Sequence, residues 1–240
     1  MTLGGRRITV AASIVVTLGL AALLATCAAG PRVGSDLAGG GSTAVPTAAE
    51  SEPDSDGATA VLFIGDSYAA GDGLTDRVDA WPWLVASALG WTATNVAIGG
   101  AGYATDTPLG YGSYPEQAVS ASGGFDLVVV SGGRNDDPGD YVPGVPDFFA
   151  TLRATFPEAS IVAIEPAWDA SPYPDHLARM SVLVAAEVAA VDGTYVETGH
   201  VLAGRSDLIQ ADGTHPNEEG HRALANSTVS ALQALGYALP

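Results

Sequence analysis

The stretch "AVLFIGDSYAAGDG", residues 60–73, joins an apolar run directly to a polar, glycine-rich turn. Val61 to Ile64 are large and apolar, and Gly-Asp-Ser follows at once, which is typical of a buried strand that ends in a turn. A serine at such a place is most often an ordinary turn or helix-cap residue. The rest of the chain decides whether Ser67 is more than that.

Downstream of Ser67 the chain alternates between short apolar runs and longer segments with helical spacing. Strands alternating with helices form parallel sheets with right-handed crossovers and helices on both faces. The sequence therefore predicts an α/β fold with a mainly parallel central sheet. The predicted strands are 60–64, 92–98, 125–133, 159–166 and 194–197, and the predicted helices are 81–89, 148–156, 176–191 and 218–235.

Four polar, glycine-rich segments follow predicted strands or precede the last helix. Ligands of parallel sheets bind beyond the carboxyl ends of the strands, so these segments should converge on one edge. Each alone is weak evidence for catalysis, because turn residues and helix caps have the same composition. Together they predict a site at that edge. The segments are Gly65–Ser67, Asn95–Tyr103, Gly132–Asp136 and Asp212–Gly220.

Three side chains in these segments have the chemistry of a nucleophilic triad. A serine hydroxyl such as that of Ser67 is a poor nucleophile unless an oriented base takes its proton. His215 suits the base, since an imidazole titrates near neutrality. Asp212, three residues earlier, can hold the other ring nitrogen and stabilise the imidazolium. The predicted catalytic residues are therefore Ser67, Asp212 and His215.

The tetrahedral intermediate of such a reaction needs hydrogen-bond donors for its oxyanion. The backbone N–H groups of Ser67 and Gly100 and the side-chain amide of Asn135 are the candidates. Glycine at position 100 lets the backbone approach a substrate closely. Gly99 remains the alternative donor, because the Gly-Gly pair permits a slip of one residue.

This order of segments resembles the SGNH hydrolases, the GDSL-type esterases and lipases. The family's blocks correspond to "GDSYAAGDG" (65–73), "NVAIGGAG" (95–102), "GRND" (133–136) and "DGTH" (212–215). The resemblance implies a flavodoxin-like three-layer α/β/α sandwich, the SGNH hydrolase fold, and ester hydrolysis without a metal or cofactor. One departure is Tyr68, which stands in place of the leucine of GDSL, at a position where other residues are common.

Composition and missing motifs exclude several other classes. The net charge of −18, with nine arginines and no lysine, should repel nucleic acid and anionic membranes. The single cysteine, Cys27, excludes an intramolecular disulfide framework and a thiolate zinc cluster. The chain has neither the G-x-S-x-G elbow of α/β-hydrolases nor the H-E-x-x-H motif of zinc proteases. His176, His200 and His221 are expected to be surface or packing residues.

The N-terminal part is expected to direct export and not to fold with the rest. Arg6 and Arg7 precede an apolar run without charge, so residues 1–30 are interpreted as an export signal. "LLATC" resembles a bacterial lipobox, which makes Cys27 the candidate lipidation site; simple cleavage and an uncleaved membrane anchor are the alternatives. Residues 31–57 are predicted to be a disordered linker, and residues 58–240 the SGNH hydrolase domain.

Two aromatic-containing stretches should leave the catalytic edge and line the cleft. They are 102–114, interpreted as flexible, and 166–176. Asp66, Tyr103 and Trp168 are the candidate substrate contacts, since aromatic rings can stack on sugars or line an acyl groove. The alternative is that these aromatic residues pack the loops onto the domain.

The predicted activity is hydrolysis of short-chain carboxylic esters, such as acetyl groups on glycans. The predicted partner is accordingly a small-molecule or glycan ester. No nucleic acid partner is expected, and membrane contact is expected only through the N-terminal segment. The protein is expected to be a monomer. Two other hypotheses for the function remain open. An alcohol could intercept the acyl-enzyme and make the protein an acyltransferase, or the domain could bind glycans with little turnover.

Overall fold

The computed structural model of the protein describes residues 57–137, 139 and 141–237. The predicted export segment 1–30, Cys27 and nearly all of the predicted linker lie outside these residues. The predictions made for them, and the domain boundaries, therefore remain predictions.

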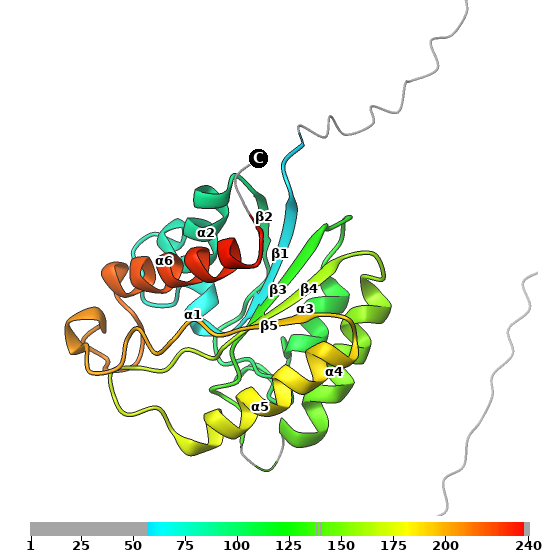
Figure 1. Ribbon diagram of the computed structural model, residues 1–240. Coiled ribbons are helices and arrows are strands. Elements are labelled where there is room, and N and C mark those ends of the chain that lie inside the picture. The colour runs from blue at the N-terminus through cyan, green and yellow to red at the C-terminus, as the bar shows by residue number, and fades with distance from the viewer. Residues whose placement is uncertain (1–56, 138, 140, 238–240) are drawn as a thin grey trace, which may run out of the picture. The chain divides into compact units, whose positions relative to one another are not determined.

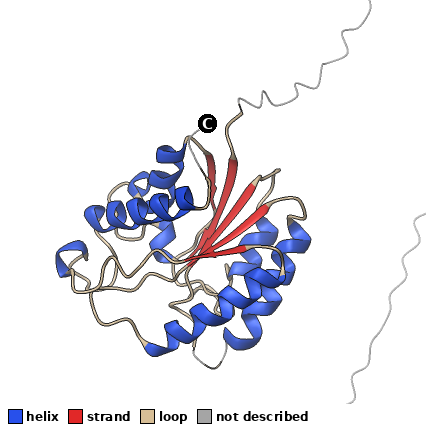
Figure 2. Cartoon of the chain, in the orientation of Figure 1, coloured by secondary structure: helices blue, strands red, loops and turns tan. Residues whose placement is uncertain are grey.

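The centre of the domain is a sheet of five parallel strands in the order β2-β1-β3-β4-β5 (Figures 1 and 2). β1 and β3 are its central pair, in register from Val61 opposite Leu127 to Gly65 opposite Ser131. The predicted parallel α/β architecture is confirmed. The strands are β1 (Ala60–Gly65), β2 (Thr92–Asn95), β3 (Leu127–Ser131), β4 (Ser160–Ile164) and β5 (Thr194–Val196).

Helices cover both faces of the sheet and complete three layers (Figure 1). Alternate residues of each strand point to opposite faces. In β1, Leu62 and Ile64 pack into the core under α4 and α5, whereas Val61 and Phe63 pack under α2 and α6. The helices are α1 (Ser67–Ala70), α2 (Trp81–Leu89), α3 (Tyr114–Ser120), α4 (Tyr141–Thr155), α5 (Asp175–Ala190) and α6 (Glu218–Ala234), with 3₁₀ turns η1 (Arg77–Asp79) and η2 (Ser206–Leu208).

The second strand is shorter than predicted. β2 stops at Asn95 and not at residue 98, although the N–H groups of Val96 and Ile98 still donate to the carbonyls of Phe63 and Gly65 on β1, at 3.0 and 3.2 Å. The Asn95 side chain makes two further hydrogen bonds. Its amide donates to the Ala69 carbonyl at 2.8 Å, and its carbonyl accepts from the Ala97 N–H at 3.1 Å. These bonds attach the second glycine-rich segment to α1, beside Ser67.

The segment expected to be flexible between β2 and β3 is partly ordered by its tyrosines. Tyr103 and Tyr114 are buried, and Tyr114 begins α3, a helix that the sequence analysis did not predict. Pro115 lies in the first turn of α3, a position that proline favours. Only Tyr111, of the three tyrosines, is exposed.

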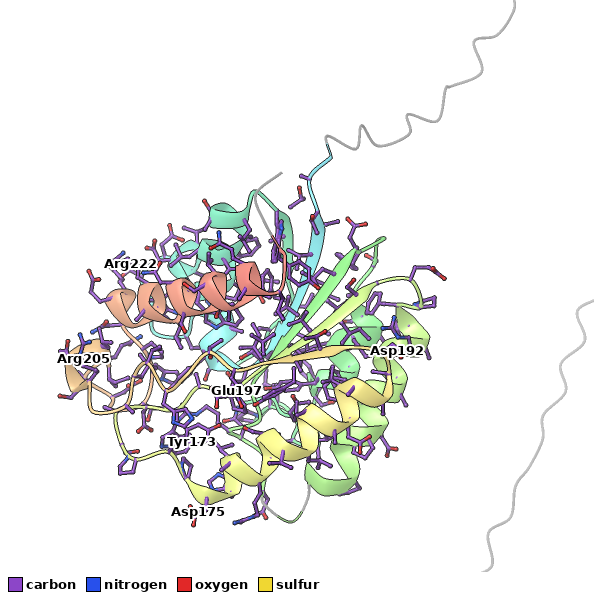
Figure 3. All side chains as sticks on the ribbon, in the orientation of Figure 1. Tyr173, Asp175, Asp192, Glu197, Arg205 and Arg222 are labelled. Carbon is purple, nitrogen blue, oxygen red and sulfur yellow. The ribbon has the colours of Figure 1, made fainter. Side chains whose placement is uncertain are left out.

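The acidic excess lies at the surface. Asp175, Asp192 and Glu197 are exposed, and their labelled side chains project from α5 and the ends of β5 (Figure 3). Such a surface favours solubility. In the part of the chain that the structure covers, no helix is both long and apolar enough to cross a bilayer.

Candidate active site

Ser67 occupies the turn between β1 and α1, at the carboxyl edge of the sheet. It is the first residue of α1 and its side chain is largely covered, with the residue 6% exposed. Asp66 precedes it as the helix cap, and its Oδ1 accepts the Tyr68 N–H at 3.0 Å. A cap of this kind satisfies an N–H that the helix leaves free. The strand end and the cap together fix the Ser67 backbone.

A buried glutamine is hydrogen-bonded to the end of β1, just before this turn. Gln117, on α3, accepts the Gly65 N–H and donates to the Gly65 carbonyl, each at 3.0 Å. Its amide also donates to the Gly112 carbonyl at 2.9 Å. The Gly65 carbonyl also accepts the Ile98 N–H at 3.2 Å, so Gln117 is the partner of the Gly65 N–H and adds a second bond to its carbonyl. Gln117 was not among the candidates from sequence.

Asp212 and His215 lie together on the loop before α6. His215 Nδ1 is 2.7 Å from Asp212 Oδ2, and Asp212 Oδ1 accepts the N–H groups of Thr214 and His215 at 2.9 and 3.0 Å. The His215 hydrogen bond, followed by these backbone bonds, lowers the pKa of Asp212 to about 2. The carboxylate therefore stays ionised and holds the ring through Nδ1.

The loop that carries Asp212 and His215 lies beside the turn that carries Ser67. The His215 ring centroid is 6.0 Å from that of Tyr68, the residue after Ser67. Among the residues that the structure covers, no hydrogen bond joins the Ser67 hydroxyl directly to His215. Catalytic bonds are often loose before substrate binds. The structure thus brings the three predicted triad residues to one edge, in two segments that touch through Tyr68.

Asn135 and Asp136 organise the second glycine-rich segment. Asn135 Nδ2 donates to the Ala101 carbonyl at 2.8 Å, which leaves the second N–H of the amide for an oxyanion. The Asp136 carboxylate, which is buried, accepts the N–H groups of Tyr103 and Ala104 at 3.0 and 2.8 Å. The predicted donors Asn135 and Gly100 are therefore held close together.

The two glycines of the Gly-Gly pair have different surroundings. Gly100 has φ +83°, a conformation that suits glycine, and a Cβ there would lie 3.0 Å from Pro108. A Cβ at Gly99 would collide with the Asp72 carboxylate. Gly100 thus needs glycine for its backbone conformation, whereas at Gly99 a displacement of the Asp72 side chain would make room. The choice of Gly100 as oxyanion donor remains a prediction.

The candidate substrate contacts are placed less favourably. Tyr103 is 2% exposed, and its ring packs edge-on against Tyr114 and Phe148, so it belongs to the core and not to the cleft rim. Asp66 is likewise buried, as the cap described above. Trp168 is partly exposed, and its ring faces the Arg134 guanidinium. Tyr103 therefore packs its loop onto the domain, as the alternative interpretation predicted. Removing an aromatic ring from water stabilises the fold, which favours this buried position.

Burial makes Asp66 a source of pH-dependent stability. Loss of solvation raises the pKa of Asp66 from 3.8 to about 6, against the Tyr68 hydrogen bond and the charge of Arg134. The folded state then binds the proton more tightly than the unfolded chain. The stability that Asp66 contributes is therefore lost as pH rises from about 4 through 6.

Asp66→Asn keeps the oxygen that caps Tyr68 and removes the buried charge. We expect the variant to gain stability relative to the parent as pH rises from 4 to 8, by at most about 3 kcal/mol for a shift of this size. Thermal unfolding of both proteins at pH 4, 6 and 8 measures this. A difference in Tm that does not change with pH would contradict the assignment of the shift to Asp66.

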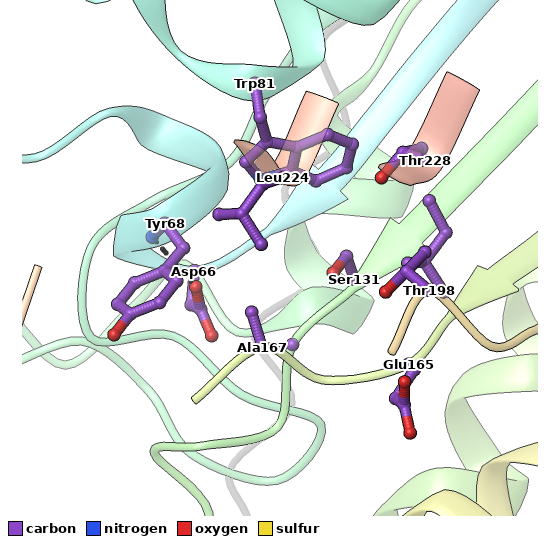
Figure 4. A pocket seen from close by; sticks show the side chains of 11 residues that line it. Asp66, Tyr68, Trp81, Ser131, Glu165, Ala167, Thr198, Leu224 and Thr228 are labelled. Atoms are coloured by element: carbon purple, nitrogen blue, oxygen red, sulfur yellow. Dashed lines mark hydrogen bonds between the residues drawn. The ribbon is translucent and has the colours of Figure 1, made fainter. Parts of the chain in front are cut away.

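A small cavity lies behind the turn that carries Ser67 (Figure 4). It encloses about 10 Å³, which is near the least volume that holds one water molecule. Asp66 and Tyr68 line it, and so do Ser131, Glu165, Thr198 and Thr228. An acyl chain does not fit there. In the residues that the structure describes, no three His, Cys, Asp or Glu side chains are grouped to hold a metal ion.

Comparison with known families places this arrangement among ester hydrolases. Residues 63–223 match the model of the GDSL-like lipase/acylhydrolase family. GDSL lipase Rv0518 of Mycobacterium tuberculosis is 33% identical over 182 residues, which are 69% of this chain and 78% of that protein.

Solved structures with the same fold include two carbohydrate esterases. A family two carbohydrate esterase from Cellvibrio japonicus superposes with a TM-score of 0.59 at 20% identity, over 75% of this chain and 62% of that one. Est24, a carbohydrate acetylesterase from Sinorhizobium meliloti, has a TM-score of 0.56 at 17% identity, over 74% and 99% of the two chains. At such identity these likenesses establish the fold alone.

Proposed function

Because this chain belongs to the GDSL-like lipase/acylhydrolase family and is a carboxylic ester hydrolase of the SGNH type, we propose that it is an exported serine esterase for short-chain esters, including acetyl groups on glycans. Ser67 is the nucleophile, His215 the general base and Asp212 the orienting acid. The observation that carries the proposal is the 2.7 Å contact between His215 Nδ1 and Asp212 Oδ2, on a loop whose His215 ring lies beside Tyr68.

Acylation begins with attack of Ser67 Oγ on the ester carbonyl carbon. The hydroxyl proton passes to His215 Nε2, and the carbonyl π electrons move onto oxygen. Donors from Ser67, Gly100 and Asn135 stabilise this oxyanion. When the intermediate collapses, the bond to the alcohol oxygen breaks, and the alcohol leaves with the proton from His215. An acyl ester on Ser67 remains.

Deacylation repeats these steps with water in place of the alcohol. His215 takes a proton from water as the water oxygen attacks the acyl carbon, and Ser67 leaves with that proton when the second intermediate collapses. The products are the carboxylic acid and the free enzyme. Asp212 holds the same ring orientation throughout, because its pKa of about 2 keeps it ionised.

One feature of this edge supports a polar alcohol such as a sugar. A second hollow, of about 420 Å³, flanks the loop of Asp212 and His215. Amide and carboxylate side chains that can bond sugar hydroxyls line it: Gln210, Asn217, Glu218 and Glu219. The carbohydrate esterases of the same fold are consistent with this choice.

Export rests on the N-terminal sequence alone. The uncharged run after Arg6 and Arg7 supports secretion, and "LLATC" supports attachment through Cys27. Metabolic labelling with a palmitate analogue, compared between the parent and Cys27→Ala, tests the attachment. Label on the parent alone establishes lipidation, and no label on either removes it from the proposal.

Turnover of p-nitrophenyl esters of increasing acyl length tests the enzymatic proposal. Acyl chains of two, four, eight and twelve carbons would be compared on residues 58–240, with Ser67→Ala alongside. We expect serine-dependent turnover that is greatest on the two-carbon ester. A maximum on the long chains would contradict the short-acyl proposal, and no turnover by a folded protein would favour the glycan-binding alternative.

Acyl transfer and hydrolysis share the acyl-enzyme, so product analysis separates them. An acetyl ester incubated with an oligosaccharide acceptor should yield acetate when water is the acceptor. Acetylated oligosaccharide as the main product would identify an acyltransferase.

Asn135→Ala tests the oxyanion hole. Loss of one such donor typically lowers turnover by ~10²–10³, and we expect a kcat loss of that order with KM little changed. Asn226→Ala, on the exposed surface of α6, is the matched control. A rise in KM with unchanged kcat would assign Asn135 to substrate binding instead.

A further inference from the structure

Tyr68 connects the turn of the nucleophile with the loop of the general base. Its hydroxyl donates a hydrogen bond to the main-chain carbonyl of Thr214, 146 residues along the chain. Thr214 directly precedes His215, whose ring is 6.0 Å from the Tyr68 ring between centroids. The residue after Ser67 thus holds the main chain next to the base.

The hydroxyl of Tyr68 keeps its proton and remains a hydrogen-bond donor. Burial raises the pKa of Tyr68 to about 12, against the nearby charge of Arg134. The proton therefore stays on the oxygen at any pH at which a histidine base works. A carbonyl oxygen has no proton to give, so the direction of the bond from Tyr68 to Thr214 is fixed.

Arg134 holds the Tyr68 ring. Its guanidinium carbon lies 4.4 Å from the centroid of the Tyr68 ring and 4.4 Å from that of Trp168. The Arg134 side chain is only 8% exposed, and its Nη2 lies 3.5 Å from Asp169. A cation over a ring face attracts it by about 0.5–2 kcal/mol, more when desolvated. Arg134 therefore keeps Tyr68 in one orientation.

This arrangement is poorly optimised for stability. Arg134 Nη1 is buried, and in the part of the chain that the structure covers it has no hydrogen-bond partner. An unsatisfied buried donor costs about 1–3 kcal/mol, and more on a charged group. A cation kept at such a cost, next to the predicted donor Asn135, points to a role in the reaction.

We propose that Tyr68 is a positioning residue for His215, and that Arg134, between Tyr68 and Trp168, fixes Tyr68 in turn. The hydroxyl keeps the main chain of His215 where Nε2 can reach the Ser67 proton. The inference rests on the proposed triad. Tyr68 stands in place of the leucine of GDSL. The proposal gives it a role that a leucine side chain cannot have, because leucine has no hydrogen-bonding atom in its side chain.

Tyr68→Phe removes the hydroxyl and keeps the ring between Arg134 and His215. A misplacement of about 1 Å can cost 10²-fold in rate, so we expect kcat on p-nitrophenyl acetate to fall by roughly 10- to 100-fold with KM within twofold. Tyr195→Phe is the matched control, since it removes a buried hydroxyl that has no partner among the described residues. Equal losses in the two variants, or a change in KM alone, would overturn the proposal.

A double variant tests whether Tyr68 acts through His215. In His215→Ala, the remaining turnover comes from the oxyanion hole and from binding. Adding Tyr68→Phe should then cause less than a twofold further loss, because residues that act as a unit are not additive. The same 10- to 100-fold loss in both backgrounds would overturn the proposal. Full activity of His215→Ala itself would instead overturn the proposed triad.

A second double variant separates the effect of Arg134 on catalysis from its effect on stability. Arg134→Met with Asp169→Asn removes the unsatisfied donor together with the carboxylate that lies beside Arg134. Because Arg134 also lowers the pKa of the buried Asp66, the Tm values are compared at pH 5, below the pKa of about 6 that Asp66 has in the parent. We expect kcat to fall at least fivefold while Tm stays within 2 °C of the parent or rises. Arg134→Lys should lose activity as well, because lysine has no planar group to lie between two rings. A lower Tm with unchanged kcat would mean that Arg134 serves packing only.

Discussion

Ser67→Ala will abolish ester hydrolysis, with kcat/KM falling by roughly 10⁴-fold or more, because loss of a triad nucleophile leaves only oxyanion stabilisation and binding. Ser67 lies at the first position of α1, where alanine also fits the helix. The fold should therefore survive, and the loss should come from the missing hydroxyl. Hydrolysis of p-nitrophenyl acetate, with circular dichroism as the check on folding, measures this.

Ser230→Ala is the matched control for Ser67→Ala. Ser230 is exposed on α6 and donates only to the Asn226 carbonyl of its own helix. Its loss should leave turnover within twofold of the parent. Retention of more than a tenth of the parent activity by folded Ser67→Ala would assign the nucleophile to another residue.

His215→Ala should be as damaging as Ser67→Ala, and Asp212→Ala should be less so. In triads where each member has been removed, the nucleophile and base cost about the same, and the acid costs roughly 10- to 100-fold less. Here Asp212 also accepts two backbone N–H groups of its loop. Asp212→Asn, which can still accept those bonds, isolates the carboxylate charge. Steady-state kinetics of the four variants give the order.

His200→Ala is the matched control for the base. His200 also pairs with a carboxylate, Glu165, at 3.2 Å, but it follows β5 and is half exposed. Its removal should leave kcat/KM within twofold of the parent. An Asp212→Ala enzyme slower than Ser67→Ala would mean that the catalytic roles are assigned wrongly.

Local patterns were sufficient to predict the sheet and most helices. The run from Leu127 to Val130 is apolar because β3 is buried on both faces, and such a run reads as a strand without knowledge of its neighbours. α2 begins and ends as predicted, with Pro82 in its first turn and Gly90 at its end. Motif spacing also predicted Ser67, Asp212 and His215 as a candidate triad, and the structure brings these residues to one edge of the sheet; their catalytic roles remain a proposal.

Contacts between distant segments could not be predicted in this way. Gln117 bonds Gly65 from 52 residues away, and no local pattern marks a glutamine that bonds the end of a distant strand. Tyr103 was predicted at the cleft rim because its stretch, 102–114, was expected to leave the catalytic edge of the sheet, but three aromatic rings of α3 and α4 bury it. The position of Arg134 between two rings likewise depends on how α1 and the loops after β3 and β4 pack together. The sequence contains these residues, and only the fold assigns their neighbours.

The order of the strands also bears on when a newly made chain gains activity. Ser67 and Asn135 follow β1 and β3, the central pair of the sheet, whereas Asp212 and His215 come after the edge strand β5. A nascent chain that has been synthesised only as far as β5 contains the proposed nucleophile without its proposed base. Under this proposal, hydrolytic activity appears only at the end of synthesis, and a chain that stalls before residue 215 does not hydrolyse esters.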